Sequence, residues 1–121
     1  MTILIADDNP PVRRIIRSLV AQESDKIYEC ADGVEALAAY VKYRPDWVLM
    51  DIEMRNMDGI AATQAIRAVN PQARIIVVTS YDDPALRTEA EEAGAAAYVI
   101  KDDLSRLRAL INEGTNTLFF S

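Results

Sequence analysis

Short apolar runs alternate with longer amphipathic segments five times along the chain. The runs are rich in β-branched residues and predict strands, whereas the segments between them repeat apolar residues every three or four positions and predict helices. This alternation is typical of a parallel sheet with helices on both faces. The predicted strands are Thr2–Ala6, Lys26–Ala31, Trp47–Met50, Ile75–Val78 and Ala97–Ile100.

The runs differ in polarity, and the difference predicts their places in the sheet. Trp47–Met50 and Ile75–Val78 are apolar throughout, which is typical of strands covered on both faces. Lys26–Ala31 mixes polar and apolar residues, so we expect it nearer an edge.

Helix signals separate the strands. Asn9 can cap a first helix that opens with Pro10-Pro11, and further helices are expected over 32–43, from Asp58, over 83–93 and from Asp102, with Gly114 as a stop. The spacing of apolar residues predicts these inward faces: Val12, Ile15, Ile16, Leu19 and Val20; Val34, Leu37 and Val41; Ala62, Ala65, Ile66 and Val69; Leu86, Ala90 and Ala93; Leu104, Leu107, Leu110 and Ile111.

Length and charge restrict the function classes. A chain of 121 residues fits one domain of the usual size, roughly 100–150 residues, and we expect that domain over residues 1–114, with 115–121 an unassigned tail. The net charge of −6 argues against a nucleic-acid partner, since phosphate binding needs clustered cations.

Three further features bear on location and chemistry. The single Cys30 falls in a strand-like run, so we expect a buried, inert thiol in a reducing compartment. No basic-plus-apolar leader opens the chain and no apolar stretch approaches the ~18 residues of a membrane span; we therefore expect a cytoplasmic protein without membrane contact. Histidine is absent, so any phosphohistidine must belong to a partner.

Residues able to do chemistry stand where the predicted strands end. Asp7 and Asp8 follow the first strand, Asp51 the third, Thr79 the fourth and Lys101 the fifth. The carboxyl ends of parallel strands meet at one edge, where open α/β folds bind ligands. Three carboxylates, a hydroxyl and an ammonium at one edge indicate a site for a metal ion and a phosphoryl group.

The acids predict a magnesium site. Crowded carboxylates repel one another unless a cation joins them, and oxygen ligands suit Mg²⁺. We expect Asp8 and Asp51 as direct ligands, Asp7 acting through water, and the backbone carbonyl of Glu53 completing the protein's share. Asp51 can then attack phosphorus as a nucleophile. Lys101 and Thr79, with the backbone amide after it, can neutralise charge on the transferring oxygens.

These residues resemble the receiver domain of bacterial response regulators, most closely the type that carries LuxR-family output domains. The likeness rests on Asp7-Asp8, on Asp51 within "LMDIEMRNMDG", on Thr79 and on "AGAAAYVIKD" ending near Lys101, and runs from Thr2 to Asn112. It implies a doubly wound, three-layer, flavodoxin-like fold with strand order 2-1-3-4-5. It also implies that Asp51 is the phosphoacceptor of a two-component phosphorelay, not part of a turnover enzyme.

The resemblance further implies partners and a switch. Phosphate would come from a sensor histidine kinase or a histidine phosphotransfer protein. Thr79 and Tyr98 would move on phosphorylation, and a downstream target or fused output domain would read the fourth helix, fifth strand and fifth helix, a face that could also form a homodimer. Arg55 stands where many receivers have proline, and Asp102 follows Lys101 where proline is frequent, so the geometry of the 101–102 peptide is left open.

Three other functions share the fold or some of these residues. An aspartate-nucleophile phosphatase of the haloacid-dehalogenase type uses similar groups, but in that family the nucleophile lies on the first strand and the acidic pair comes late. A receiver-like scaffold that is never phosphorylated would have no need of the intact acid, threonine and lysine set. A flavodoxin-like flavin carrier would need a phosphate-binding loop rich in Ser, Thr and Gly after the first strand, and this sequence shows none.

Overall fold

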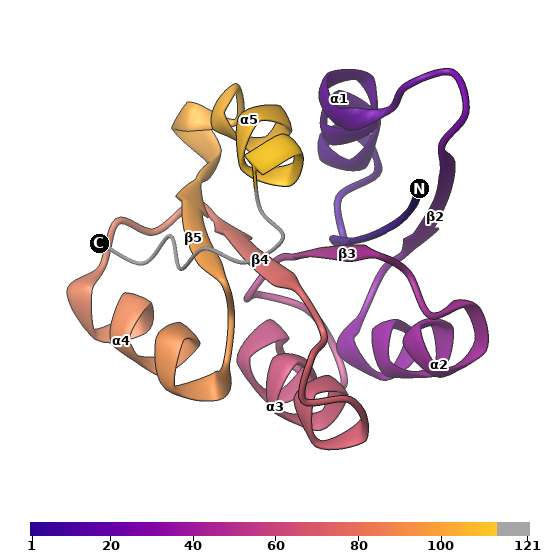
Figure 1. The fold of residues 1–121 in the computed structure, drawn as a ribbon. Coiled ribbons are helices and arrows are strands. Elements are labelled where there is room, and N and C mark those ends of the chain that lie inside the picture. The colour runs from indigo at the N-terminus through magenta and orange to yellow at the C-terminus, as the bar shows by residue number, and fades with distance from the viewer. Residues whose placement is uncertain (114–121) are drawn as a thin grey trace.

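The protein forms one parallel sheet, seen in a computed structural model that describes residues 1–113. Neighbouring strands pair in the order β2-β1-β3-β4-β5, as Figure 1 shows. This confirms the predicted flavodoxin-like α/β fold and strand order. The strands are β1 (Thr2–Ala6), β2 (Lys26–Cys30), β3 (Trp47–Met50), β4 (Ile75–Thr79) and β5 (Ala97–Ile100).

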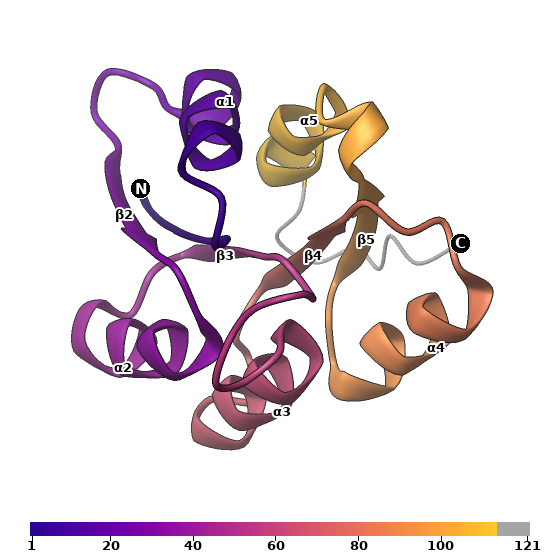
Figure 2. The same cartoon turned by 180° about the vertical axis from the view of Figure 1, so that it is seen from behind.

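Helices cover both faces of the sheet. Figures 1 and 2 show α1 and α5 over one face and α2, α3 and α4 over the other. The bounds are α1 (Pro10–Val20), α2 (Gly33–Tyr43), α3 (Gly59–Val69), α4 (Pro84–Ala93), the 3-10 turn η1 (Lys101–Asp103) and α5 (Arg106–Glu113). Within residues 1–113, no helix combines the length and the apolar character needed to cross a membrane.

Side-chain caps fix where the first helices begin. Asn9 and Asp32 each accept a hydrogen bond from a backbone N–H in the first turn of α1 and α2, and Asp58 and Asp83 do the same for α3 and α4. Such caps satisfy amides that have no partner inside the helix. Because Asn9, Asp32 and Asp83 follow their strands within four residues, α1, α2 and α4 start close to the carboxyl edge of the sheet, whereas a longer loop separates β3 from Asp58.

The core lies on both faces of the sheet. Ile3, Ile5 and Trp47 pack beneath α1 and α5, whereas Leu4, Val48 and Met50 pack above α2 and α3. All residues of β3 and β4 are buried, while β2 is partly exposed at the edge. These observations confirm the assignment of the interior and edge strands.

The predicted inward faces of three helices are partly wrong. Exposed side chains on α1, α2 and α3 include Ile15, Leu19, Val34, Val41 and Val69, whose exposed fractions lie between 40% and 51%. On α2 the buried face is instead formed by residues one position earlier along the helix: Gly33, Ala36 and Tyr40. Small residues there let the helix approach closely, and Asn70 donates a hydrogen bond to the Tyr40 hydroxyl. The predicted faces of α4 and α5 are confirmed.

The last helix begins later than predicted. Residues 101–103 form the turn η1 and α5 starts at Arg106, four residues after the expected Asp102. No peptide bond within residues 1–113 is cis, so the 101–102 peptide is trans. The predicted stop at Gly114 and the tail 115–121 lie outside the described residues.

Candidate functional site

Strand register brings the predicted site residues to one edge. Ala6 pairs with Met50, so Asp7 and Asp51 leave neighbouring strands side by side, and the amide of Asp51 donates to the Ala6 carbonyl at 2.9 Å. Thr79 pairs with Ile100 on the other side of the sheet centre, which places Lys101 at the same edge. The prediction that these strand ends meet is confirmed.

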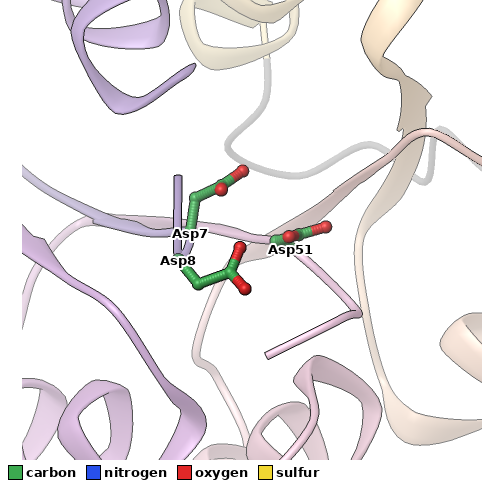
Figure 3. A group of neighbouring side chains, drawn as sticks. All are labelled: Asp7, Asp8 and Asp51. Carbon is green, nitrogen blue, oxygen red and sulfur yellow. The ribbon is translucent and has the colours of Figure 1, made fainter. Parts of the chain in front are cut away.

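The three carboxylates form a tight group. One oxygen each of Asp7, Asp8 and Asp51 lies within 4.8 Å of the others, as Figure 3 shows. Asp7 and Asp51 are buried, whereas Asp8 is exposed. Buried carboxylates this close together repel one another, since little water screens them.

Lys101 is the cation that contacts this group within residues 1–113. Its Nζ lies 2.9 Å from Oδ2 of Asp7 and 3.4 Å from Oδ2 of Asp51. One ammonium does not balance two buried carboxylates. Burial and the charge of Asp7 together raise the pKa of Asp51 to about 6, although Lys101 opposes the shift. Burial works against the charged form of Lys101, but Asp7 and Asp51 outweigh it and raise the pKa of that ammonium.

The donor set fits a hard divalent cation. Oδ2 of Asp7 is buried and accepts no well-formed hydrogen bond from the described residues, although the Lys101 ammonium lies nearby. The three carboxylates present oxygens close to one another, and Asp8 is exposed to solvent. This arrangement matches the preference of Mg²⁺ for a few carboxylate ligands and several waters. Asp7, Asp8 and Asp51 could therefore hold Mg²⁺ at this edge.

A family model describes almost the whole chain. Residues 3–112 match the model of the response regulator receiver domain. This chain belongs to the response regulator receiver domain family. The resemblance suggested by the sequence is confirmed.

Several known proteins are similar to this receiver domain. The uncharacterized transcriptional regulatory protein YhcZ of Bacillus subtilis is 43% identical over 104 residues, covering 84% of this chain and 49% of YhcZ. A crystal structure of a LuxR-family response regulator from Aurantimonas has a TM-score of 0.85 at 35% identity, covering 93% of this chain and 82% of that one. The CheX-CheY-BeF3-Mg+2 complex from Borrelia burgdorferi has a TM-score of 0.84 at 26% identity, covering 93% and 89%. The chain thus spans about half the length of YhcZ.

Membership fixes the coarse function. A receiver domain is a phosphoacceptor module of two-component signalling and not a turnover enzyme. Its acidic pocket, formed here by Asp7, Asp8 and Asp51, serves Mg²⁺-dependent phosphorylation. The relatives include LuxR-family regulators, in agreement with the type suggested by the sequence.

The receiver domain also brings Thr79, Tyr98 and Tyr81 together. Thr79 is buried, and its Oγ1 accepts a hydrogen bond from the Tyr81 amide at 3.2 Å. Tyr98 is buried too, and its hydroxyl donates to the Tyr81 carbonyl at 2.7 Å. Burial raises the pKa of Tyr98, so the hydroxyl remains a donor at neutral pH. The roles of Thr79 and Tyr98 as moving parts stay a prediction.

Tyr81 makes a side-chain contact with Glu53 that the sequence did not predict. Its hydroxyl donates to the carboxylate of Glu53, so a side chain from the loop after β4 meets one from the loop after β3. The bond to that carboxylate raises the pKa of Tyr81. The sequence places Tyr81 two residues after Thr79 and Glu53 two residues after Asp51, and in receiver domains residues at these places tune dephosphorylation, but nothing in the sequence indicates that the two side chains meet. The use of the Glu53 backbone carbonyl as a metal ligand stays a prediction.

Cys30 takes no visible part in the site chemistry. It is half-buried at the end of β2, and burial, followed by the charges of Glu35 and Asp32, raises its pKa to about 12. A thiol with so high a pKa is almost entirely protonated at neutral pH, in line with the predicted inert thiol.

Proposed function

We propose that Asp51 is the residue that accepts the phosphoryl group, from a phosphohistidine of a sensor kinase or a histidine phosphotransfer protein. The observation that carries the proposal is the buried Asp51 carboxylate, which lies near two other carboxylates and the Lys101 ammonium at the carboxyl edge of the sheet. The similarity to a CheY structure solved with BeF3 and Mg²⁺ supports it.

The ligand roles are those that the sequence predicts. Asp8 and Asp51 would bind Mg²⁺ directly, Asp7 would act through water, and the Glu53 carbonyl would complete the protein's share. Bound there, Mg²⁺ would neutralise carboxylate charge and polarise phosphoryl oxygens. The Ile52 amide donates to Oδ1 of Asp51 at 2.9 Å, which fixes the orientation of that carboxylate.

The reaction uses groups that lie at this edge of the sheet. An oxygen of Asp51 forms the new O–P bond while the P–N bond to the partner's imidazole breaks, and the electron pair of that bond stays on the imidazole nitrogen. Lys101 neutralises charge on the transferred oxygens, and Thr79 with the backbone amide after it supplies hydrogen bonds to them. Positioning and electrostatics of this kind carry most of the catalysis in phosphoryl transfer.

Phosphorylation would be communicated to a partner through Thr79 and Tyr98. Thr79 moving toward the phosphoryl group would break its bond with the Tyr81 amide and change the surroundings of Tyr98. We assign the output face to α4, β5 and α5, where a downstream target, a fused output domain or a second copy would bind. The domain comprises residues 1–114 and acts in the cytoplasm, without a nucleic-acid partner of its own.

The test is phosphorylation by a small acyl phosphate with Mg²⁺. The intact chain should gain the mass of one phosphoryl group, and Asp51→Asn should gain none. Asp102→Asn, an exposed acid one residue after Lys101, is the matched control and should be phosphorylated like the parent. Incorporation into Asp51→Asn would contradict the assignment, and steady turnover of a phosphomonoester would instead favour a phosphatase.

A further inference from the structure

The loops after β1 and β3, which carry the proposed metal ligands, both contact the segment around the end of the outer strand β2. That segment itself supplies none of the proposed ligands. It comprises the end of β2 and the start of α2, residues 29–33, and we call it the edge support. We propose that the edge support positions the loops after β1 and β3 for binding of the cation, an inference that rests on the proposed function of Asp7, Asp8 and Asp51. Arg13 and Asn56 make the connecting contacts and are positioning residues.

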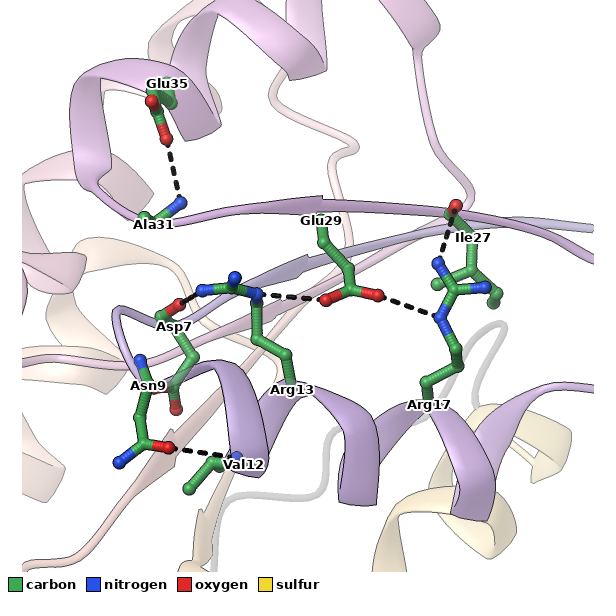
Figure 4. Close-up of polar contacts among 9 residues, drawn as sticks. All are labelled: Asp7, Asn9, Val12, Arg13, Arg17, Ile27, Glu29, Ala31 and Glu35. Atoms are coloured by element: carbon green, nitrogen blue, oxygen red, sulfur yellow. Dashed lines mark hydrogen bonds and ion pairs between the residues drawn. The ribbon is translucent and has the colours of Figure 1, made fainter.

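The first loop is held through the main chain of Asp7. Nη1 of Arg13 donates to the Asp7 carbonyl at 2.6 Å while its Nε donates to Oε1 of Glu29 at 2.9 Å, as Figure 4 shows. The Asp7 amide in turn donates to the Cys30 carbonyl at 3.1 Å. Both main-chain polar groups of Asp7 are therefore held from the β2 side, one directly and one through Arg13.

Arg17 provides an internal comparison for Arg13. Its Nε donates to Oε2 of the same Glu29 at 2.8 Å, and one of its other nitrogens lies 3.4 Å from the Ile27 carbonyl (Figure 4). Among residues 1–113, the side chain of Arg17 thus bonds to β2 alone. The two arginines share one carboxylate, but only Arg13 extends the contact to the loop that carries the acids.

The second loop is held through Asn56. Its side-chain amide donates to Oδ2 of Asp32 at 2.6 Å, while Oδ1 of Asp32 caps α2 by accepting from the Glu35 amide at 2.8 Å. Asn56 has φ of 67°, a left-handed conformation that asparagine tolerates better than most residues. The loop after Asp51 is thus tied to a helix start rather than stiffened by a proline at position 55.

Gly33 fixes the distance between the two segments. Its amide donates to the Met57 carbonyl at 3.0 Å, and a Cβ placed on Gly33 would lie 2.2 Å from that same oxygen. Only glycine permits this approach. A similar limit acts at the far end of the loop, where a Cβ on Gly59 would lie 1.8 Å from the Asp51 carbonyl oxygen.

Contacts of this kind change metal affinity without touching the metal. Groups that orient ligands typically alter affinity by roughly 10–100-fold when they are removed. We therefore expect Arg13→Gln to weaken Mg²⁺ binding by about 10-fold, whereas Arg17→Gln, which loses its bond to the same Glu29, should stay within about twofold of the parent.

The second contact has its own pair of variants. Asn56→Gly removes the bond to Asp32 and still permits the left-handed backbone. Asp32→Ser keeps a helix cap but lacks the second oxygen. Each should weaken Mg²⁺ binding by about 10-fold, and the double variant should be little weaker than either alone because both break one contact. Asp83→Ser, the equivalent change at the cap of α4, is the control.

The readouts are Mg²⁺ titration by calorimetry on the full chain and hydrogen exchange of the Asp7 and Gly33 amides in metal-free protein. Faster exchange at Asp7 in Arg13→Gln, and at Gly33 in Asn56→Gly, together with the affinity losses, would support the proposal. Affinities equal to the parent's in both variants, or an equal loss in Arg17→Gln and Asp83→Ser, would overturn it. A parent chain that binds no Mg²⁺ would instead overturn the proposed function itself.

Discussion

Two charge clusters in this receiver domain have opposite compositions. At the edge support, one carboxylate, Glu29, is shared by the guanidinium groups of Arg13 and Arg17. At the carboxyl edge of the inner strands, one ammonium, Lys101, is shared by the carboxylates of Asp7 and Asp51. The clusters are linked because Arg13 also bonds the Asp7 carbonyl.

The same physical terms lead to opposite results in the two clusters. Burial disfavours the charged form of both Glu29 and Asp51. At Glu29 the hydrogen bonds from Arg17 and Arg13 overcome burial, and the pKa is lowered. At Asp51 the charge of Asp7 adds to burial, Lys101 does not compensate, and the pKa rises to about 6.

The comparison indicates that the charges around Glu29 stabilise the fold, whereas the charges around Asp51 serve the function. The Glu29 carboxylate is fully compensated by two guanidinium groups of the same chain, and these ion pairs connect α1 to β2. The Asp51 cluster holds an excess of negative charge that folding alone leaves uncompensated, so a cation entering from outside gains more from binding there. The three predictions below test this difference, beginning with the largest expected effect.

Asp51→Asn should stabilise the metal-free protein. The folded pKa of Asp51, about 6, lies above the ordinary value of 3.8, so folding favours the protonated form and stability falls as pH rises between these values. At pH 8 the variant should exceed the parent by about 3 kcal/mol in free energy of unfolding, shrinking to about 1 kcal/mol at pH 4.5. Urea unfolding with a chelator present, at both pH values, measures this.

Asp8→Asn is the matched control, because it removes a carboxylate of the same pocket that is exposed. Its effect on stability should stay within about 0.5 kcal/mol at either pH. An Asp51→Asn protein that is no more stable than the parent at pH 8 would show that the pocket is electrostatically balanced.

Glu29→Gln should destabilise the protein by about 1 kcal/mol at pH 7, as expected for a partly exposed ion-pair network. The folded pKa of Glu29 is lowered from 4.5, so its contribution is present above that value and is lost as pH falls below it. The difference between variant and parent should therefore shrink as the pH falls below 4.5, in thermal melts run across pH. Exposed Glu23→Gln should show no such difference, and a pH-independent loss in Glu29→Gln would point to packing instead of charge.

Trp47 fluorescence should change little when Mg²⁺ binds. Trp47 is fully buried beneath α1 and α5 and lies four residues before Asp51, about 13 Å away along a strand. Because the acidic pocket is held in place from the edge support, we expect its loading to leave the opposite end of β3 undisturbed. A strong quench on titration with Mg²⁺ would show that rearrangement reaches well beyond the pocket.

The pocket was predictable from sequence because strand ends are local features. Each of Asp7, Asp51, Thr79 and Lys101 closes an apolar run, and parallel pairing alone brings such ends to one edge. No knowledge of side-chain packing was needed. The sheet order followed from the family resemblance rather than from periodicity.

The helix faces and the supporting contacts were harder to predict. Apolar residues such as Val34 lie outside on α2 because small Gly33 and Ala36 set the close face, and hydrophobicity does not encode that choice. The bond from Asn56 to Asp32 joins residues 24 positions apart and depends on a left-handed backbone. Neither feature leaves a periodic trace in the sequence.

The chain's only thiol lies within the edge support. Cys30 is flanked by Glu29 and Ala31, and its pKa of about 12 leaves almost no thiolate while the structure stays closed. With so little thiolate present, an electrophile reacts slowly with the half-buried sulfur of Cys30 while this segment stays folded. The rate at which a thiol reagent modifies Cys30 therefore reports how often this part of the domain opens. No engineered label is needed.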